Sequence, residues 1–388
     1  MALLAWPEDA TGSCQVRKKS EHEERMVPGV KYECATPFID GANVAIDKDG
    51  LLSLIKAGFL RDALYMTTKL LSNIGQGLGM TGRQSQNTQL SLEVWSCRFQ
   101  LMMALRMHSQ LLDELSAFGE LDSSDLFLQH YPHFAGQKGT LVPFSLRLLH
   151  AEVPSFSPFP YSSIVRAHKL IEDTAKAIEI VRQNFAPPET ELDIWHERLE
   201  EAWMVKARVL FRLKEYAKAF EFYEWIISNS KSKERRTNVQ KMLFWMAMHV
   251  GDGQKLVKYQ AELSKNGIVA EEDIFPAFKA VFDGDYNDAL DHLQKMKAQN
   301  PDESALDPKS CNNEAVCLLY CGKPVDCVQL LFNHRGPVAV PLALNVATVS
   351  DLVSTNSAAL KQSFLDECTR DKPHNNLFEP AEVMRMHQ

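Results

Sequence analysis

Four cysteines in the last third of the chain could bind zinc through their thiolates. They are Cys311, Cys317, Cys321 and Cys327. Structural zinc sites usually hold such ligands as Cys-x2–4-Cys pairs on a turn, whereas Cys317 and Cys321 lie four residues apart in a helical pattern beside Leu318 and Leu319. Free cysteine packs like a small hydrophobic residue. The spacing therefore predicts buried structural thiols and no bound metal.

Three histidines, His130, His133 and His150, could supply imidazole ligands to a metal. No Asp, Glu or Cys stands at matching helical spacing on both sides of them. We therefore predict that these histidines pack within a loop or contact a partner protein.

The glycines Gly77, Gly79 and Gly82 have the spacing that lets backbone N–H groups approach a phosphate. A dinucleotide site needs a strand before such glycines, but residues 64–74 have the apolar spacing of a helix. The chain also lacks the Gly-x-Ser-x-Gly elbow of serine hydrolases. We predict a loop between helices, no cofactor and no catalytic residue; the alternative is a nucleotide- or metal-dependent enzyme that uses Gly79 with His130 and His133.

The charge of the chain excludes some partners. Its 388 residues carry 42 Lys and Arg against 50 Asp and Glu, which gives a net charge of −8. This balance offers nucleic acid and anionic lipid no general attraction, so we expect no nucleic-acid partner and membrane contact only through other proteins. The basic run from Lys231 to Arg236 predicts a solvent-exposed turn.

The composition favours a cytoplasmic protein with reduced thiols. Eight cysteines in so long a chain are too sparse for a disulfide framework. Residues 1–9 lack the basic and apolar regions of a secretory signal. The longest uncharged stretch, Gly336 to Ser350, is too short and too rich in proline to span a bilayer.

The elements that carry these residues are predicted to be helices. From Asp49 onward, apolar residues recur three and four apart, and alternation with period two is almost absent. Proline-rich breaks divide the pattern. We predict a flexible arm over residues 1–48, helical repeats with an inserted glycine-rich loop over 49–153, tetratricopeptide repeats over 161–335, and a C-terminal helical cap and tail over 336–388.

The repeats are visible as a recurring small or apolar residue in each second helix. These residues are Ala219, Leu256, Ala289 and Cys327, at spacings of 37, 33 and 38. A period near 34 is typical of tetratricopeptide repeats. We therefore predict an all-α fold, a tetratricopeptide-repeat α-solenoid in which antiparallel helix pairs form a superhelix.

Some tetratricopeptide arrays bind chaperone C-termini through a clamp of Lys and Asn on successive first helices. In this chain only Lys309 with Asn313 has that pattern. One such pair cannot hold two carboxylates. A free tetratricopeptide co-chaperone or adaptor therefore stays an alternative to the interpretation that follows.

One segment of the sequence is more characteristic of a particular family than the repeats are. It contains Phe118-Gly-Glu-Leu-Asp122, Tyr131-Pro-His133, Val142-Pro-Phe-Ser-Leu-Arg147 and His150-Ala-Glu152. With the glycine-rich loop and the stretch from Asn312 to Lys323, it resembles the twelfth-subunit family of the TRAPP vesicle-tethering complex, over roughly residues 50–370. The chain departs from that family at Pro324, around Gly253 and in its short N-terminal arm.

The resemblance implies a non-catalytic scaffold subunit of the metazoan TRAPP III complex, located in the cytoplasm and at the endoplasmic reticulum-Golgi intermediate compartment and Golgi. Such a subunit supports guanine-nucleotide exchange on a Rab-family GTPase, performed by the small core subunits, in endoplasmic-reticulum-to-Golgi transport and autophagy. Its implied partners are other TRAPP subunits, above all the eleventh, and the eighth. Our candidate partner-binding residues are Tyr131, Pro132, His133, Pro143, Phe144, Arg147, Asn312 and Asn313.

Overall fold

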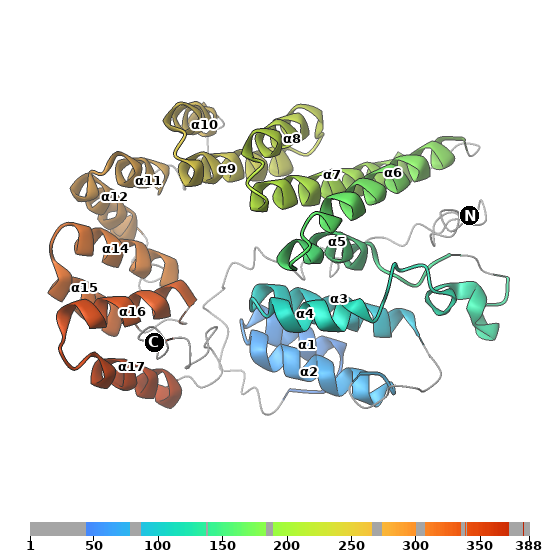
Figure 1. Ribbon diagram of the computed structural model, residues 1–388, viewed down its shortest axis with the longest axis horizontal. Coiled ribbons are helices and arrows are strands. Elements are labelled where there is room, and N and C mark those ends of the chain that lie inside the picture. The colour runs from blue at the N-terminus through green and yellow to red at the C-terminus, as the bar shows by residue number, and fades with distance from the viewer. Residues whose placement is uncertain are drawn as a thin grey trace. The chain divides into compact units, whose positions relative to one another are not determined.

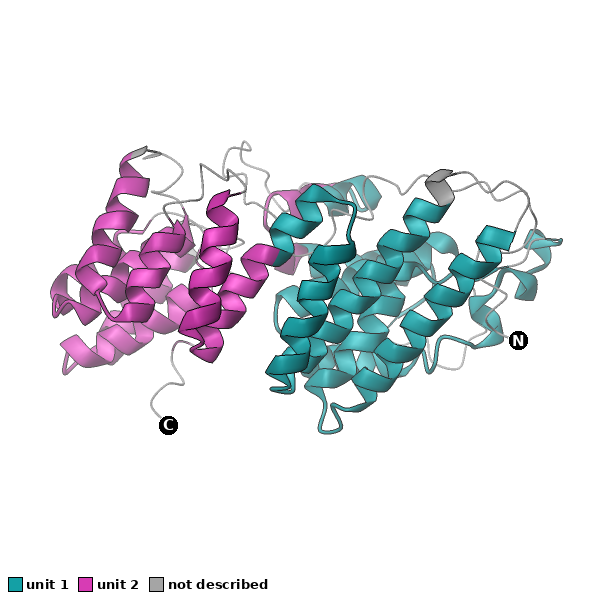
Figure 2. Ribbon diagram, turned by 90° about the horizontal axis from the view of Figure 1, so that it is seen from above, with its two compact units in different colours: residues 1–31, 45–52, 63–239 teal, residues 32–44, 53–62, 240–388 magenta. Residues whose placement is uncertain are grey.

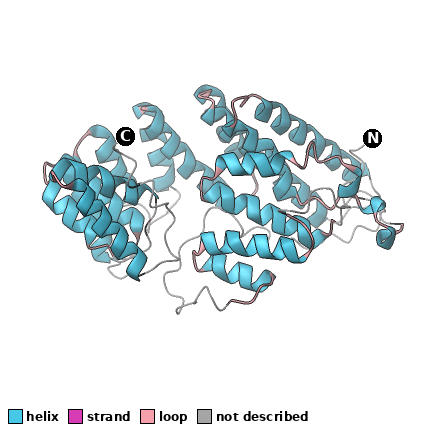
Figure 3. Cartoon of the chain, turned by 60° about the horizontal axis from the view of Figure 1, so that its bottom comes forward, coloured by secondary structure: helices cyan, strands magenta, loops and turns pink. Residues whose placement is uncertain are grey.

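A computed structural model of the chain confirms the helical prediction (Figure 1). It describes residues 44–77, 87–136, 139–183, 189–265, 274–299, 307–334, 338, 340–371 and 383. Residues 1–43 of the predicted arm, Gly79, Gly82 and most of the predicted tail lie outside these ranges. Within them Figure 3 shows helices and loops without a strand, and an isolated β-bridge joins Phe127 and Thr140.

The described helices follow one another through the chain. They are α1 (Lys48–Lys56), α2 (Leu60–Asn73), α3 (Gln89–Ala104), α4 (His108–Ser116), α5 (Phe144–Glu152), α6 (Ser162–Gln183), α7 (Glu189–Arg212), α8 (Tyr216–Asn229), α9 (Lys233–Val250), α10 (Gly253–Lys265), α11 (Ile274–Asp283), α12 (Tyr286–Gln299), α14 (Pro308–Tyr320), α15 (Pro324–Phe332), α16 (Val340–Val353) and α17 (Ser357–Asp371). Short 3-10 turns lie between α4 and α6. None of the described helices is long and apolar enough to cross a membrane.

The chain divides into two compact units, shown in Figure 2. Unit 1 comprises residues 1–31, 45–52 and 63–239, and unit 2 comprises residues 32–44, 53–62 and 240–388. Helices α3 to α8 lie in unit 1, and α10 to α17 lie in unit 2. The domain boundaries predicted from the sequence stay a prediction.

Consecutive helices pack as pairs. In unit 1, α6 packs on α7 and α7 on α8, and in unit 2, α11 packs on α12 and each helix from α14 to α16 packs on the next. The four residues that marked the repeats, Ala219, Leu256, Ala289 and Cys327, are each at most 1% exposed. Ala277 and Ala289 share one buried cluster, so small residues let α11 and α12 approach closely. The predicted all-α tetratricopeptide solenoid is confirmed.

The helix pairs are joined by turns of one type. After α9, α11 and α14 the chain turns at Gly251, Gly284 and Gly322, whose φ angles are 80°, 83° and 74°. In each turn the next residue donates its N–H to a carbonyl five residues back, as Asp285 does to Ala280 at 2.9 Å. This is the helix-terminating bond that a left-handed residue permits. The turn after α7 has the same bond, but Lys214 occupies the left-handed position with φ 65°.

Candidate functional site

The segment between α4 and α5, which carries much of the predicted partner-binding site, is folded on itself in unit 1. It contains the 3-10 turns η3 (Ser124–Leu126), η4 (Leu128–His130) and η5 (Pro132–Phe134). Two backbone bonds close it, from Leu141 N to Leu126 O at 2.8 Å and from Leu128 N to Gly139 O at 3.0 Å. Thr140 adds a side-chain bond to Leu126 O at 3.1 Å. These hydrogen bonds therefore hold the described part of this segment in one conformation.

Tyr131 ties this segment to the residues just before α3. Its side chain is 9% exposed, and its hydroxyl donates to Asp125 O at 2.8 Å and accepts from Asn87 N at 2.9 Å. Burial raises the pKa of Tyr131. The exposed residues Pro132 and His133 follow directly, so Tyr131 positions its two neighbours at the surface.

A chain of side-chain bonds ties the same segment to the start of the glycine-rich loop. Trp95 Nε1 donates to Gln76 Oε1 at 2.8 Å, and Gln76 Nε2 donates to Asn87 Oδ1 at 3.1 Å. Asn87 Nδ2 then donates to Asp125 O at 3.1 Å. Of the three glycines with phosphate-loop spacing, only Gly77 lies within the described residues. Gln76, beside it, is thus engaged in holding protein groups together.

Helix α5 carries three further candidates. Pro143 stands at its N-cap, and Pro143, Phe144 and Arg147 are half-buried. The Phe144 ring lies 5.3 Å from the Arg198 guanidinium of α7. His150, at the end of the helix, is 7% exposed and its Nε2 lies 2.7 Å from Gly119 O. Helix α5 therefore connects the predicted segment with the first long helix pair.

Beyond α5 lies a buried ionic network that sequence reasoning missed. The Glu152 carboxylate, whose side chain is 7% exposed, accepts bonds from Arg208 Nη2 at 2.6 Å and Nε at 3.1 Å. Burial opposes ionisation of Glu152, but Arg208 and Arg212 lower its pKa overall. The Arg212 guanidinium also lies 3.8 Å from the Phe156 ring, on which His108 stacks at 3.8 Å. This arrangement joins α4, α5 and α7.

The loop after this network and the first turn of α6 present exposed apolar side chains. Phe159, Tyr161 and Val165 are 81%, 68% and 69% exposed. Three serines hold the loop: Ser157 Oγ accepts from Phe159 N at 3.1 Å, Ser162 Oγ donates to Phe159 O at 2.9 Å, and buried Ser163 Oγ donates to Glu152 O at 3.2 Å. We call Phe159 and Tyr161, together with Val165 in the first turn of α6, the aromatic loop. The prolines around Phe159 indicated only a break, although an aromatic residue between two prolines could have suggested an exposed contact.

An ion pair joins the aromatic loop to the predicted segment. Arg166, next to Val165, pairs with Glu120 at 2.7 Å and donates to His150 O at 3.4 Å. The exposed groups on both sides of this pair therefore lie on connected elements of unit 1.

The two remaining candidates lie on α14 in unit 2. Asn312 accepts a bond from Asn345 Nδ2 of α16 at 2.7 Å, and both Asn312 and Asn313 are half-buried. The structure thus places Tyr131, Pro132 and His133 at the N-cap and in the first residues of η5. Pro143, Phe144 and Arg147 lie at the N-cap and in the first turn of α5, and Asn312 and Asn313 lie on α14. Their role in partner binding stays a prediction.

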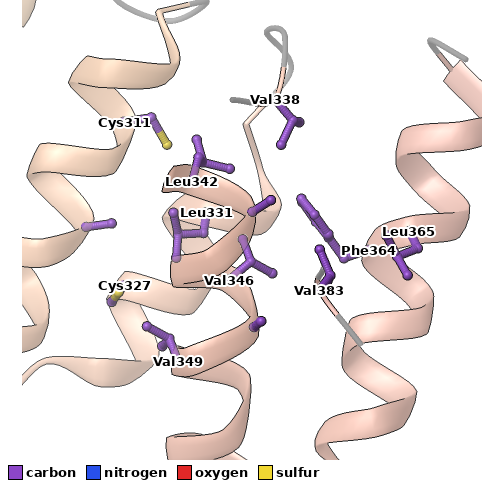
Figure 4. Close-up of a cluster of buried hydrophobic side chains, with 13 residues drawn as sticks. Cys311, Cys327, Leu331, Val338, Leu342, Val346, Val349, Phe364, Leu365 and Val383 are labelled. Carbon is purple, nitrogen blue, oxygen red and sulfur yellow. The ribbon is translucent and has the colours of Figure 1, made fainter. Parts of the chain in front are cut away.

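Three of the four clustered cysteines are buried, as predicted. Figure 4 shows Cys311 and Cys327 among the apolar side chains of α14 to α17, and Cys317 lies in the cluster around Ala289. Burial raises the pKa of Cys311 to about 12 and those of Cys317 and Cys327 to about 11. Cys321 is only half-buried, just beyond α14, and donates to Asn287 Oδ1 at 3.4 Å. Among the described residues no three His, Cys, Asp or Glu side chains are grouped to hold a metal.

The basic run at the start of α9 makes ion pairs with α7. Lys231 pairs with Asp193 at 3.1 Å, and Arg235 pairs with Glu200 at 3.3 Å and Glu201 at 3.6 Å. Only part of the run is the solvent-exposed turn that its composition indicates, because Arg235 joins α9 to α7.

Comparison with known proteins extends the resemblance seen in the sequence. No family model matches the chain. The chain is similar to "Trafficking protein particle complex subunit 12" of Homo sapiens, with 27% identity over 341 residues, which cover 82% of this chain and 46% of the human protein. The protein of the same name from Mus musculus is 26% identical over 364 residues, with 87% and 45% coverage. The chain thus spans less than half the length of these relatives. The resemblance to the twelfth subunit of the TRAPP complex is confirmed.

Proposed function

We propose that this chain is a non-catalytic scaffold subunit of a TRAPP complex. The observation that supports this most directly is the similarity to two proteins named as subunit 12, over more than four-fifths of the chain. Paired helices agree with such a role, because solenoids present extended surfaces to partner proteins. The partners would be other TRAPP subunits, above all the eleventh, and the eighth.

The finer parts of the proposal come from the family resemblance. The complex would be TRAPP III, and the chain would support nucleotide exchange on a Rab-family GTPase without performing it. It would act in endoplasmic-reticulum-to-Golgi transport and autophagy, in the cytoplasm and at the Golgi and the intermediate compartment. Contact with the membrane would be made by other members of the complex.

Unit 1 offers a surface for this assembly. The exposed residues Pro132 and His133 and the aromatic loop lie on elements joined by the Arg166–Glu120 pair. Exposed aromatic side chains on a backbone held by hydrogen bonds lose little entropy when a partner covers them. We propose the aromatic loop as one contact with another subunit and Pro132 with His133 as another.

The test is capture of the tagged full chain from cultured animal cells, followed by mass spectrometry. TRAPP subunits should be recovered with the wild type, and recovery of none would contradict the proposed function. The double variant Phe159→Ala with Tyr161→Ala should lower recovery of at least one subunit by about ten-fold, since aromatic anchors carry much of an interface's affinity.

Tyr65 supplies the matched control for this double variant. It is 62% exposed on α2 in unit 1, with the Lys69 ammonium 4.6 Å from its ring. Tyr65→Ala should leave recovery unchanged. If the double variant recovers every subunit as well as the wild type does, the scaffold function stands and the aromatic loop is not its contact. A saturable thermal shift with a nucleotide or a divalent metal would instead favour an enzyme.

A further inference from the structure

Helix α7 departs from the repeat signature at one charged position. The signature of a first repeat helix places Leu three residues after Trp, followed by a small residue. In α7 the same positions hold Trp203, Lys206 and Ala207. The next helix fits the signature, with Ala219 and Tyr223 buried. A lysine therefore stands where the repeat normally places leucine.

Lys206 lies within a group of aromatic side chains from α7 and α8. Its Nζ is 5.1 Å from the centre of the Trp203 ring and 5.2 Å from that of Phe222. Trp203 in turn lies 5.0 Å from Phe222 and 5.3 Å from Trp225, measured between ring centres. Trp225 is 41% exposed. We call Trp203, Lys206, Phe222 and Trp225 the aromatic–lysine patch.

The charge of Lys206 is not balanced by the described part of the chain. Two arginines further along α7, Arg208 and Arg212, both face the Glu152 carboxylate. Lys206 makes no ion pair with any described residue, and its ammonium lies over the faces of two rings. Burial lowers the pKa of Lys206. A partly desolvated ammonium held on aromatic rings is complementary to an anion that brings apolar groups with it.

We propose that the aromatic–lysine patch binds a partner segment in which a carboxylate side chain stands beside an apolar one. The carboxylate pairs with Lys206, and the apolar side chain packs on Trp225 and Phe222. This inference rests on the proposed scaffold function and adds the chemistry of one contact. Leucine at position 206 would serve an apolar partner equally well, so the lysine selects for the carboxylate.

The test uses the purified full chain and two labelled peptides that differ only in charge. In the first, glutamates flank a leucine–phenylalanine pair; in the second, glutamines replace the glutamates. Both peptides have blocked termini, and binding is measured by fluorescence anisotropy. The wild type should bind the glutamate peptide about ten-fold more tightly than the glutamine peptide, as expected for a partly desolvated charged contact. This preference should shrink as the salt is raised from about 50 mM to about 500 mM.

Two variants assign the binding to the patch. Lys206→Leu restores the repeat signature, so it should melt no lower than the wild type and should lose the preference for the glutamate peptide. Trp225→Ala should weaken binding of both peptides. Lys233→Leu removes an equal charge from an exposed position on α9 and should keep the preference.

Three results would overturn the inference: no binding of the glutamate peptide, equal binding of both peptides by the wild type, or a preference that survives Lys206→Leu. Because the assay contains no TRAPP subunit, these results leave the capture experiment to decide the proposed function by itself.

Discussion

The two units of the chain stabilise similar helix pairs with different chemistry. In unit 1, buried polar side chains such as Arg98, His150 and Glu152 join helices through directional bonds. In unit 2, the cores are made of aliphatic, aromatic, alanine and cysteine side chains, and among the described residues only Ser350 and Lys361 are buried polar residues there. Apolar packing tolerates changes of side chain that keep the volume, whereas an ionic network does not tolerate loss of one member.

Arg98 illustrates the first kind of core. Its guanidinium donates to the Glu114 carboxylate of α4 at 2.6 Å and 2.7 Å and to Thr68 of α2 at 2.8 Å. One side chain of α3 thus fixes two neighbouring helices. Such bonds specify a geometry that apolar contacts alone leave less defined.

The largest predicted effect is in unit 1. Arg208→Met keeps most of the side-chain volume but leaves the buried Glu152 carboxylate with only Arg212, at 3.8 Å. We expect the free energy of unfolding to fall by about 3–5 kcal/mol, because the buried carboxylate loses both of its short hydrogen bonds and keeps only the long contact with Arg212. Urea unfolding measures the loss, and faster hydrogen exchange in α5 and α7 would place it there.

The exposed pair of Lys231 with Asp193 provides the control for this change. Lys231→Met should cost less than about 1 kcal/mol, since exposed ion pairs contribute little. Equal losses of unfolding free energy in the two variants would contradict the expectation that burial of Glu152 makes its ion pair with Arg208 more important than an exposed pair.

In unit 2 the matching experiment uses Leu331, which is 1% exposed in the cluster of α14 to α17. Leu331→Ala should cost about 2–4 kcal/mol through the cavity that it leaves. Leu331→Met, which keeps the volume, should cost less than about 1.5 kcal/mol. A methionine variant as damaged as the alanine variant would show that the core of unit 2 is no more tolerant than that of unit 1.

This difference also explains which parts of the fold could be predicted from the sequence. The small size and regular spacing of Ala289 and Cys327 predict close helix packing, and both residues are buried in the structure. The bond between Glu152 and Arg208 joins residues 56 apart and follows no period. Its members are ordinary charged residues of amphipathic helices in the sequence, so only the fold reveals that they meet.

The candidate site, like the fold, could be predicted only in part from the sequence. The segment around Tyr131 was singled out by its residues, but the sequence could not indicate that Tyr131 is internal while Pro132 and His133 are exposed. That division depends on hydrogen bonds to Asn87 and Asp125. The proposed role of Lys206 depends on both the sequence and the structure. Its position departs from the repeat signature, and its contacts with aromatic rings are visible only in the structure.

A pH experiment tests the polar core of unit 1 at His150. Burial, with Arg166 and Arg147 nearby, lowers the pKa of His150 to about 4. Gly119 O can only accept, so the neutral ring donates from Nε2. An unfolded histidine has a pKa of about 6.5, so the unfolded chain binds a proton first and stability falls as the pH drops from about 6.5 towards 4.

Between about pH 7 and about pH 5 this histidine should remove about 2 kcal/mol of stability. His150→Gln keeps an N–H donor for Gly119 without a titrating ring, so the loss between the two pH values should shrink by about that amount. Urea unfolding at both pH values measures it, and an unchanged pH dependence would show that His150 is not held neutral.

The smallest predicted effect compares two turns that share one hydrogen-bond pattern. In unit 1 Lys214 has φ 65°, and in unit 2 Gly284 has φ 83°. A side chain in this region costs backbone energy that glycine avoids. Lys214→Gly should therefore raise the free energy of unfolding by about 0.5 kcal/mol, after the extra freedom of glycine in the unfolded chain is subtracted. A Cβ at Gly284 would meet no atom within 4 Å, so Gly284→Ala should cost about 1 kcal/mol through the backbone alone. Urea unfolding measures both changes in the free energy of unfolding. If they have opposite signs, both turns require the left-handed conformation, and of the two only the turn at Lys214 in unit 1 carries the backbone strain of a side chain in it.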